Sequence, residues 1–211
     1  MLTLLEKESL MANPDKSIDP KILLCAKTEF QQHGFAKASL REICDNAGVT
    51  TGAFYNRYKN KDELFYALVE DAILAIEEKL VLMDRIAATG NGIEDWFFSA
   101  VSSEEHLPTI IDFLYEKYDS FRLLLCCSNG SKYENFLHCL TERNTQIMLN
   151  YIQTQDKWTL RVDEEELHLL CTTFWSSIFE TIQHEFPKEK AKNYCKVLAR
   201  FFHWEAILKT N

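Results

Sequence analysis

Apolar residues recur every three or four positions over long stretches of this chain, which is the spacing of one face of an α-helix. The pattern is most regular after Glu164, where it runs through Leu167, Leu170, Cys171, Phe174, Trp175, Ile178, Phe179 and Ile182. Residues that break helices are rare, with six Gly and four Pro among 211 residues. No segment alternates convincingly between apolar and polar residues, so the sequence predicts an all-α fold.

The chain is long enough for one or two domains with a buried core. Its strongest break is the run Thr89–Gly92, which holds two glycines and an asparagine. We expect a flexible leader over residues 1–17, an N-terminal unit over residues 18–64 and a larger helical part over residues 65–211, with a connecting helix over residues 60–84. Further helices are predicted over residues 93–102, 107–118, 133–155, 164–182 and 187–208.

The N-terminal unit has clear helix boundaries. A first helix begins at Pro20 and ends at Gly34, a residue that closes helices in the left-handed conformation. Ser39 is followed three residues later by Glu42, the spacing of a capping box, and this second helix ends at Gly48. Thr50 is the expected N-cap of a third short helix. Two short helices joined by a tight turn are the plan of a helix-turn-helix motif.

In that motif the second short helix lies in the major groove of duplex DNA. Phe54 and Tyr58, four residues apart, are expected to face inward, which leaves the residues between them exposed. Asparagine is suited to adenine, arginine to guanine or a phosphate, and a small alanine to a thymine methyl group. The predicted DNA-binding residues are Ser39, Thr50, Thr51, Gly52, Ala53, Tyr55, Asn56, Arg57, Lys59 and Lys61.

The charge distribution agrees with this prediction. The whole chain carries a net charge of −9, which by itself speaks against nucleic acid. Between Ser17 and Lys61, however, seven cationic residues outnumber four anionic ones. A mildly basic segment therefore lies on an acidic body, although chance clustering alone would also produce such an asymmetry.

Residues 36–64, from Ala-Lys-Ala-Ser-Leu-Arg-Glu-Ile through Gly-Ala-Phe-Tyr to Lys-Asp-Glu-Leu, resemble the DNA-binding region of the tetracycline-repressor (TetR) family. The resemblance covers roughly residues 20–70 and does not extend to residues 90–211. It implies an all-α homodimer in which the first three helices bind DNA, the fourth links, and the remaining helices dimerise and bind an effector. It also implies a repressor that leaves its operator when a small molecule enters the helical core.

The resemblance assigns roles to single positions. Ser39 matches a helix cap that also touches phosphate, Thr50 the cap of the recognition helix, and Tyr55 and Lys61 the phosphate-binding positions. The chain departs from the family's common residues at Cys44 (commonly Ala), Arg57 (often His) and Tyr58 (often Phe).

The last two helices carry wide, aromatic apolar stripes. These stripes either form a core within one chain or build a four-helix bundle from two chains. We favour the second interpretation, because large apolar patches mark interfaces and a dimer supplies two half-sites roughly 34–36 Å apart. The predicted interface residues are Leu167, Leu170, Phe174, Ile178, Phe179, Leu198, Phe201 and Phe202.

An effector pocket is expected in the helical core. For each aromatic residue singly, ordinary core packing is the simpler interpretation, but together they indicate an apolar or aromatic effector. The candidate pocket residues are Trp96, Phe113, Phe121, Met148 and Trp175.

Other functional classes find little support. Seven Cys with no C-x-x-C pair and no secretory signal indicate free thiols in a reducing, cytoplasmic setting. His168 and Cys171 have ligand spacing, but two ligands do not make a zinc site, so no metal and no cofactor are expected. No apolar run approaches the length of a membrane span. No nucleophile elbow, P-loop or dinucleotide-binding turn is present, so the sequence does not predict an enzyme.

The sequence therefore predicts a sequence-specific DNA-binding transcription regulator, a repressor released from a palindromic operator by a small molecule. The alternative is a helical dimer that carries or senses a small molecule and binds no operator. The two differ in whether Arg57 and Lys61 are needed for function.

Overall fold

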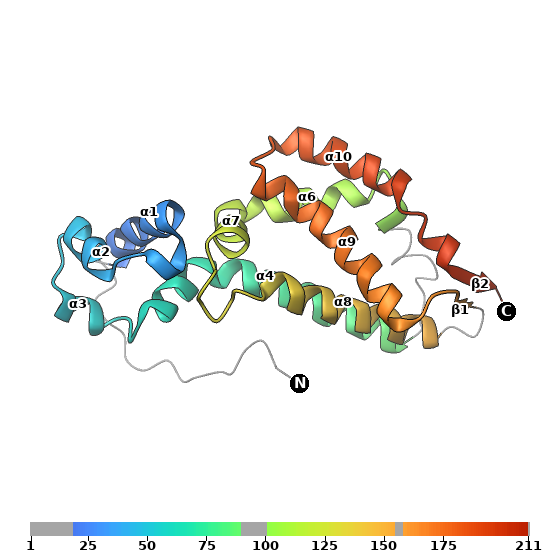
Figure 1. Cartoon of the computed structure of the whole chain (residues 1–211), viewed down its shortest axis with the longest axis horizontal. Coiled ribbons are helices and arrows are strands. Elements are labelled where there is room, and N and C mark those ends of the chain that lie inside the picture. The colour runs from blue at the N-terminus through green and yellow to red at the C-terminus, as the bar shows by residue number, and fades with distance from the viewer. Residues whose placement is uncertain (1–18, 90–100, 155–157, 211) are drawn as a thin grey trace.

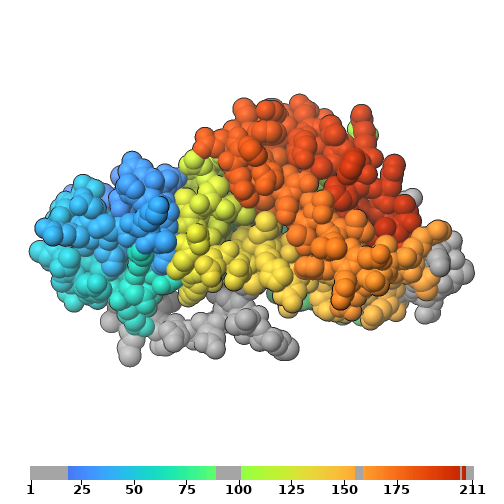
Figure 2. Space-filling view, viewed as in Figure 1, coloured from blue at the N-terminus to red at the C-terminus, as the bar shows by residue number. Residues whose placement is uncertain are grey.

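The computed structural model describes residues 19–89, 101–154 and 158–210 and is almost entirely helical. The predicted leader over residues 1–17 and most of the predicted helix over residues 93–102 lie outside these ranges. Three N-terminal helices form one end of the molecule, the later helices form the larger body, and α4 runs from one to the other (Figure 1). In the space-filling view the N-terminal end is a distinct lobe (Figure 2).

The N-terminal lobe contains α1 (Asp19–Lys37), α2 (Leu40–Ala47) and α3 (Thr51–Tyr55). Gly34 interrupts α1 with φ 69° and ψ 165°, and Gly48 ends α2 with φ 68° and ψ 32°. The Thr50 hydroxyl caps α3 by accepting from the backbone N–H of Ala53 at 3.1 Å. The predicted helix-turn-helix is therefore present, although α3 is only five residues long.

The cap of α2 differs from the predicted capping box. The Ser39 hydroxyl accepts from the Glu42 backbone N–H at 3.3 Å, as expected. The Ser39 backbone N–H, however, donates to Oε1 of Glu29 at 2.9 Å, and Glu29 is a buried residue of α1. A carboxylate ten positions away thus replaces Glu42 and ties α1 to the start of α2.

Aromatic rings hold the N-terminal lobe to α4 (Lys61–Thr89). The rings of Phe30 and Phe65 meet edge to face at 5.1 Å, and those of Phe35 and Phe65 at 5.4 Å, the arrangement that aromatic pairs prefer. With 29 residues, α4 is longer than the predicted 60–84 and spans about 43 Å at 1.5 Å per residue. One helix therefore belongs to the cores of both lobes.

The larger lobe contains α6 (Leu107–Glu116), α7 (Tyr118–Cys126), α8 (Phe136–Gln153), α9 (Glu164–Gln183), α10 (Lys188–Phe201) and the short 3₁₀ helix η1 (Trp204–Ile207). The sequence did not predict α7. A break at Lys117, with φ −125° and ψ 36°, separates it from α6. The predicted helix over residues 133–155 begins three residues later than expected.

Two short strands are a further departure from the prediction. β1 (Trp158–Leu160) pairs antiparallel with β2 (Leu208–Thr210), so the last helix ends at Phe201 rather than at Leu208. Strands of three residues are too short to show an alternating pattern. The small ribbon leaves the all-α class unchanged.

The apolar stripes of α9 and α10 face the core of their own chain, which corrects the predicted subunit interface. Leu167, Phe174, Ile178, Phe179, Leu198 and Phe202 are all buried within one chain. The segment after α10 explains part of this burial, because Phe202 and Trp204 fold back onto Phe174 with ring centroids 5.2 Å and 5.3 Å away. Of the predicted interface residues, Leu170 is half-buried and Phe201 is exposed.

Candidate nucleic-acid interface and effector cavity

Helix α3 presents its outer face to solvent. Phe54 is fully buried and its ring lies 5.6 Å from that of half-buried Tyr58, so these two residues anchor the segment as predicted. Thr51, Gly52, Tyr55 and Asn56 are exposed, and Ala53 is half-buried. The small and hydrogen-bonding side chains needed to approach base edges thus lie on one accessible face.

Arg57 is not exposed, which contradicts the prediction that it faces DNA. Its side chain is 9% exposed, and its Nε donates to Oδ1 of Asp19 at 2.9 Å. Its Nη1 donates to the Ala53 carbonyl oxygen at 2.9 Å. Arg57 therefore joins the end of α3 to the start of α1, and these contacts hold α3 in position against the N-terminal lobe.

The two lysines of the predicted interface differ in setting. Lys59 is 70% exposed and pairs with Glu63 at 3.4 Å, a contact that solvent weakens. The ammonium of half-buried Lys61 donates to the carbonyl oxygens of Ala36 and Ala38 at 3.3 Å and 3.2 Å. Lys61 thus holds the connection between α1 and α2, next to half-buried Ser39, and Lys59 is the freer of the two charges.

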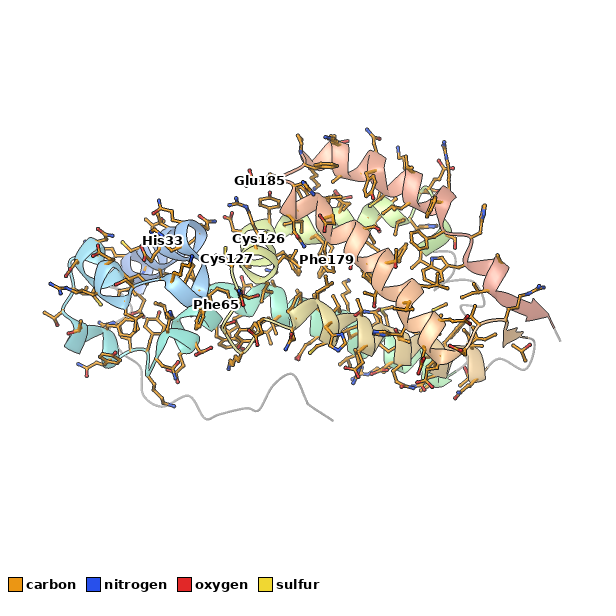
Figure 3. All side chains as sticks on the ribbon, viewed as in Figure 1. His33, Phe65, Cys126, Cys127, Phe179 and Glu185 are labelled. Atoms are coloured by element: carbon orange, nitrogen blue, oxygen red, sulfur yellow. The ribbon has the colours of Figure 1, made fainter. Side chains whose placement is uncertain are left out.

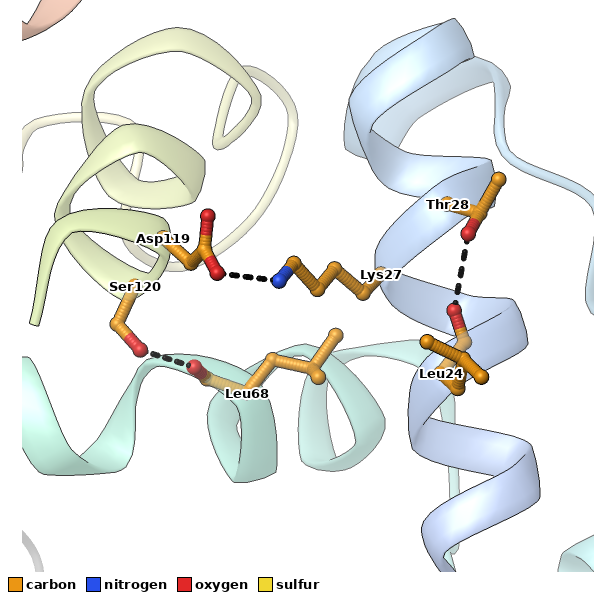
Figure 4. A network of polar contacts seen from close by, with 6 residues as sticks. All are labelled: Leu24, Lys27, Thr28, Leu68, Asp119 and Ser120. Atoms are coloured by element: carbon orange, nitrogen blue, oxygen red, sulfur yellow. Dashed lines mark hydrogen bonds and ion pairs between the residues drawn. The ribbon is translucent and has the colours of Figure 1, made fainter.

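A junction links α7 to the N-terminal lobe. Lys27 of α1 forms an ion pair with Asp119 of α7, and the neighbouring Ser120 hydroxyl donates to the Leu68 carbonyl oxygen of α4 at 2.7 Å (Figure 4). The Phe35 backbone N–H donates to the Cys127 carbonyl oxygen at 2.7 Å. Cys127 lies where the end of α7 meets the N-terminal lobe (Figure 3).

The turn after α7 continues this junction. The Lys132 backbone N–H donates to Oδ1 of Asp62 at 3.2 Å, and the Tyr133 ring stacks on that of Tyr66 at 6.1 Å. At Gly130, with φ 85°, a Cβ atom would lie 3.1 Å from the Cβ of Ala36. The larger lobe therefore reaches the N-terminal lobe by two routes, along α4 and across α7.

A cavity of about 360 Å³ lies between α4, α6, α8 and α9. Of the predicted pocket residues, Phe113 and Trp175 line it. Phe121 and Met148 do not line it; both are fully buried, and Phe121 packs behind Phe113 with ring centroids 6.0 Å apart. Trp96 lies outside the described residues.

Most of the cavity wall comes from residues that the pocket prediction missed. Its apolar members from α4 are Ile76, Leu80 and Met83, and its polar members include Lys79 and Asn144. The apolar stripe of α4 is visible in the sequence, but by itself it predicts only the packing face of a connecting helix. Because α4 also carries Phe65 into the N-terminal core, the cavity and the N-terminal lobe share one continuous helix.

The buried thiols of the larger lobe are kept protonated. Burial raises the pKa of Cys171 to about 11 and that of Cys195 to about 12. Burial, with the charge of Asp45 adding to it, also raises the pKa of Cys44 in α2. Since the thiolate is the reactive form, these three residues act as small apolar core residues.

Within residues 19–89, 101–154 and 158–210, no three His, Cys, Asp or Glu side chains gather so that they could hold a metal ion. None of the helices that the structure describes is long and apolar enough to cross a membrane.

Comparison with known proteins identifies the N-terminal lobe. Residues 22–68, which span α1 to the first turns of α4, match the sequence model of bacterial regulatory proteins of the tetR family. This part of the chain is therefore similar to the DNA-binding region of the TetR family. The Tn10 TetC protein of Escherichia coli is 29% identical over 97 residues, or 46% of each chain. The probable acrEF/envCD operon repressor of Escherichia coli is 42% identical over 45 residues, 21% of this chain and 20% of the repressor.

These matches thus cover from a fifth to about half the length of the curated relatives. Solved structures extend the likeness in fold over most of the chain. SmeT in its triclosan complex superposes with a TM-score of 0.60 at 17% identity, covering 91% of each chain. NalD, the secondary repressor of the MexAB-OprM multidrug efflux pump of Pseudomonas aeruginosa, gives a TM-score of 0.56 at 16% identity, covering 88% of this chain and 95% of NalD. At such identities the likeness concerns the fold.

Proposed function

We propose that this chain is a sequence-specific regulator of transcription that binds duplex DNA through α3. The observation that carries the proposal is the exposed face of α3, where Thr51, Gly52, Tyr55 and Asn56 stand clear of the core while Phe54 anchors the helix from behind. Asn56 would read a base edge, and Tyr55 would contact a phosphate. Ser39, Thr50, Ala53 and Lys59 are the other residues that we propose for this interface.

The active form would be a homodimer. Outward-facing apolar side chains remain on the last two long helices, where Leu169 of α9 is 64% exposed and Val197 and Phe201 of α10 are 57% and 76% exposed. Apolar residues gathered on a surface mark interfaces. Two copies joined there would present two α3 helices to half-sites roughly 34–36 Å apart.

The regulator would be a repressor released by an apolar or aromatic effector in the cavity. NalD is a repressor, and SmeT was solved in complex with triclosan, which gives precedents for both parts of this proposal. The effector must prefer the state that cannot bind DNA, because only a difference in affinity shifts an equilibrium. Helices α4 and α6 line the cavity, and α4 and α7 both contact the N-terminal lobe. A change in the shape of the cavity therefore has two routes toward α3.

The experiment is selection from a pool of random duplex DNA at stated salt, with the full chain. Enrichment of a palindrome by the wild type, and its loss or relaxation with Asn56→Ala, would support a dimeric operator-binding regulator. Equal recovery of all sequences at low salt would sink the proposal. The cavity would then favour the second candidate, a carrier or sensor of a small molecule that binds no operator.

A further inference from the structure

The cavity walls are largely apolar and partly aromatic. Phe113 of α6 and Trp175 and Phe179 of α9 contribute rings, and the Trp175 and Phe179 rings lie 6.3 Å apart at an interplanar angle of 33°. Rings in such tilted arrangements accept a further ring in offset or edge contact. A volume of about 360 Å³ is at the small end of the range for ligand pockets. The walls therefore suit a compact aromatic molecule.

Asn144 of α8 supplies the polar feature of this wall. Its side chain is almost completely buried, with the residue 2% exposed, and it lines the cavity. Its Nδ2 donates to the Leu140 carbonyl oxygen at 3.0 Å, which fixes the orientation of the amide. Its Oδ1 is buried without a hydrogen-bond partner among the residues that the structure describes.

An unpaired buried carbonyl oxygen is unfavourable, and most such atoms in proteins have a partner. Because an amide oxygen only accepts hydrogen bonds, the missing partner must be a donor. A hydroxyl group on a ring that fills the aromatic wall would satisfy it without adding a charge to the interior. A carboxylate or an ether oxygen in the same place would not, since neither donates.

The remaining polar residues argue against a cationic ligand. The described lining includes no Asp or Glu, and its one Lys, Lys79, is exposed at the surface with Nζ 5.6 Å from the Phe113 ring centroid. A buried cation would therefore lack a counter-charge near Asn144, and burying a charge without a partner is strongly unfavourable.

We propose that the cavity binds a hydroxylated aromatic compound whose hydroxyl group donates to Oδ1 of Asn144 while its ring packs among Phe113, Trp175 and Phe179. This inference rests on the proposed function in one respect only, namely that the bound compound is the effector of a regulator. Binding itself does not require DNA.

The test is isothermal titration calorimetry of the full chain with three probes of one ring system: 2-naphthol, 2-methoxynaphthalene and naphthalene. The wild type is expected to bind 2-naphthol about tenfold more tightly than either of the other two, because only 2-naphthol donates. Asn144→Leu, which replaces the amide by an apolar group of similar size, is expected to abolish this preference while retaining binding of naphthalene.

Thr172→Val is the matched control. The Thr172 hydroxyl is also buried without a partner among the described residues, but it does not line the cavity, so its loss should leave the preference intact. Equal affinity of the wild type for all three probes, or no binding of any, would overturn the proposal, and so would a preference that survives in Asn144→Leu. If Asn144→Leu fails to fold, the affinities of the wild type for the three probes still test the proposal.

The two proposals fail separately. An enriched operator without the 2-naphthol preference would remove only the inferred ligand class. The preference without any enriched operator would remove only the regulatory function.

Discussion

Arg57 and Asp19 form an ion pair that closes the N-terminal lobe, with Nε of Arg57 2.9 Å from Oδ1 of Asp19 and the Arg57 side chain 9% exposed. The pair joins the end of α3 to the first residue of α1, 38 positions earlier. A residue predicted to read DNA thus fixes the helix that presents the reading residues.

Arg57→Ala is therefore expected to destabilise the protein, by about 1.5–3 kcal/mol, because it removes hydrogen bonds to a charged group and leaves Asp19 unpaired. The measurement is the free energy of unfolding in urea. The adjacent Asn56→Ala is the control, since Asn56 is exposed, and its stability should stay within about 0.5 kcal/mol of the wild type. If Arg57→Ala were as stable as the wild type but had an altered base preference, the prediction that Arg57 reads DNA would be restored.

Lys59 and Lys61 are expected to contribute to different properties, Lys59 to DNA affinity and Lys61 to the stability of the fold. Lys59→Gln should leave the unfolding free energy unchanged and reduce the slope of log affinity against log salt by about 1, as one lost phosphate contact would do. Lys61→Gln should lower the unfolding free energy by about 1 kcal/mol, because Lys61 donates to the Ala36 and Ala38 carbonyl oxygens and its Nζ lies 4.6 Å from the Phe35 ring centroid. Identical behaviour of the two variants in both assays would contradict this division.

The junction between α7 and the N-terminal lobe can be strained at one glycine. Gly130→Ala adds a Cβ 3.1 Å from that of Ala36 and forces a residue other than glycine to φ 85°. Gly48→Ala is the matched control, because Gly48 also has positive φ (68°) but has open space around its Cβ position. Both variants should lose about 1 kcal/mol from the backbone. Gly130→Ala should lose more, since the contact with Ala36 must also give way.

The comparison is made by urea unfolding monitored at equilibrium. A Gly130→Ala variant no less stable than Gly48→Ala would mean that the approach of Ala36 to Gly130 is not tight in solution. If effector signals cross this junction, Gly130→Ala should also reduce the effect of ligand on DNA affinity, which the control should leave unchanged.

The parts of the fold that were predicted correctly depend on local sequence. The caps at Ser39 and Thr50 involve acceptors and donors three residues apart, and the left-handed closure at Gly48 depends on one residue. Such features follow from the chain alone. The apolar periodicity of α4 and α9 likewise identifies each helix without reference to its neighbours.

The errors concern partners that are distant in sequence. Nothing near Arg57 shows that Asp19 lies beside it, and nothing near Ser39 shows that Glu29 caps it. The direction of the α9 stripe was predicted wrongly because a stripe shows that a face is covered but not by which chain. The lining of the cavity was predicted only in part for the same reason. Phe113 and Trp175 could be proposed because they are aromatic. The role of Asn144 depends on its neighbours in space, which leave its Oδ1 without a hydrogen-bond partner among the described residues.

Two adjacent phenylalanines offer a test of the dimer. Phe201 is 76% exposed and Phe202 is 9% exposed, so they separate self-association from folding. Phe201→Ser is expected to shift the protein toward monomer in sedimentation velocity and to leave the monomer's stability nearly unchanged. Phe202→Ala is expected to cost about 3–5 kcal/mol of stability, because it empties a site packed against Phe174 and Trp204. A fully dimeric Phe201→Ser protein would place the interface elsewhere.

Cys195 predicts how stability depends on alkaline pH. Burial raises its pKa in the folded chain to about 12 from an ordinary value of 9.0. Above pH 9 the unfolded chain therefore loses the thiol proton while the folded chain keeps it, so unfolding releases a proton and stability falls as pH rises toward 12. One such thiol contributes a decline of up to about 1.4 kcal/mol per pH unit in that window and none below pH 8.

Cys195→Ala removes this contribution. The variant should lose about 1 kcal/mol at pH 7, the ordinary cost of a core substitution, but its stability should decline less steeply between pH 9 and 10.5 than that of the wild type. Leu198→Ala, on the same helix and also buried, is the control: it should be less stable at every pH with an unchanged slope, because it removes volume but no titrating group. Equal slopes for the wild type and Cys195→Ala in urea unfolding would mean that the Cys195 thiol ionises as readily in the folded chain as in the unfolded one.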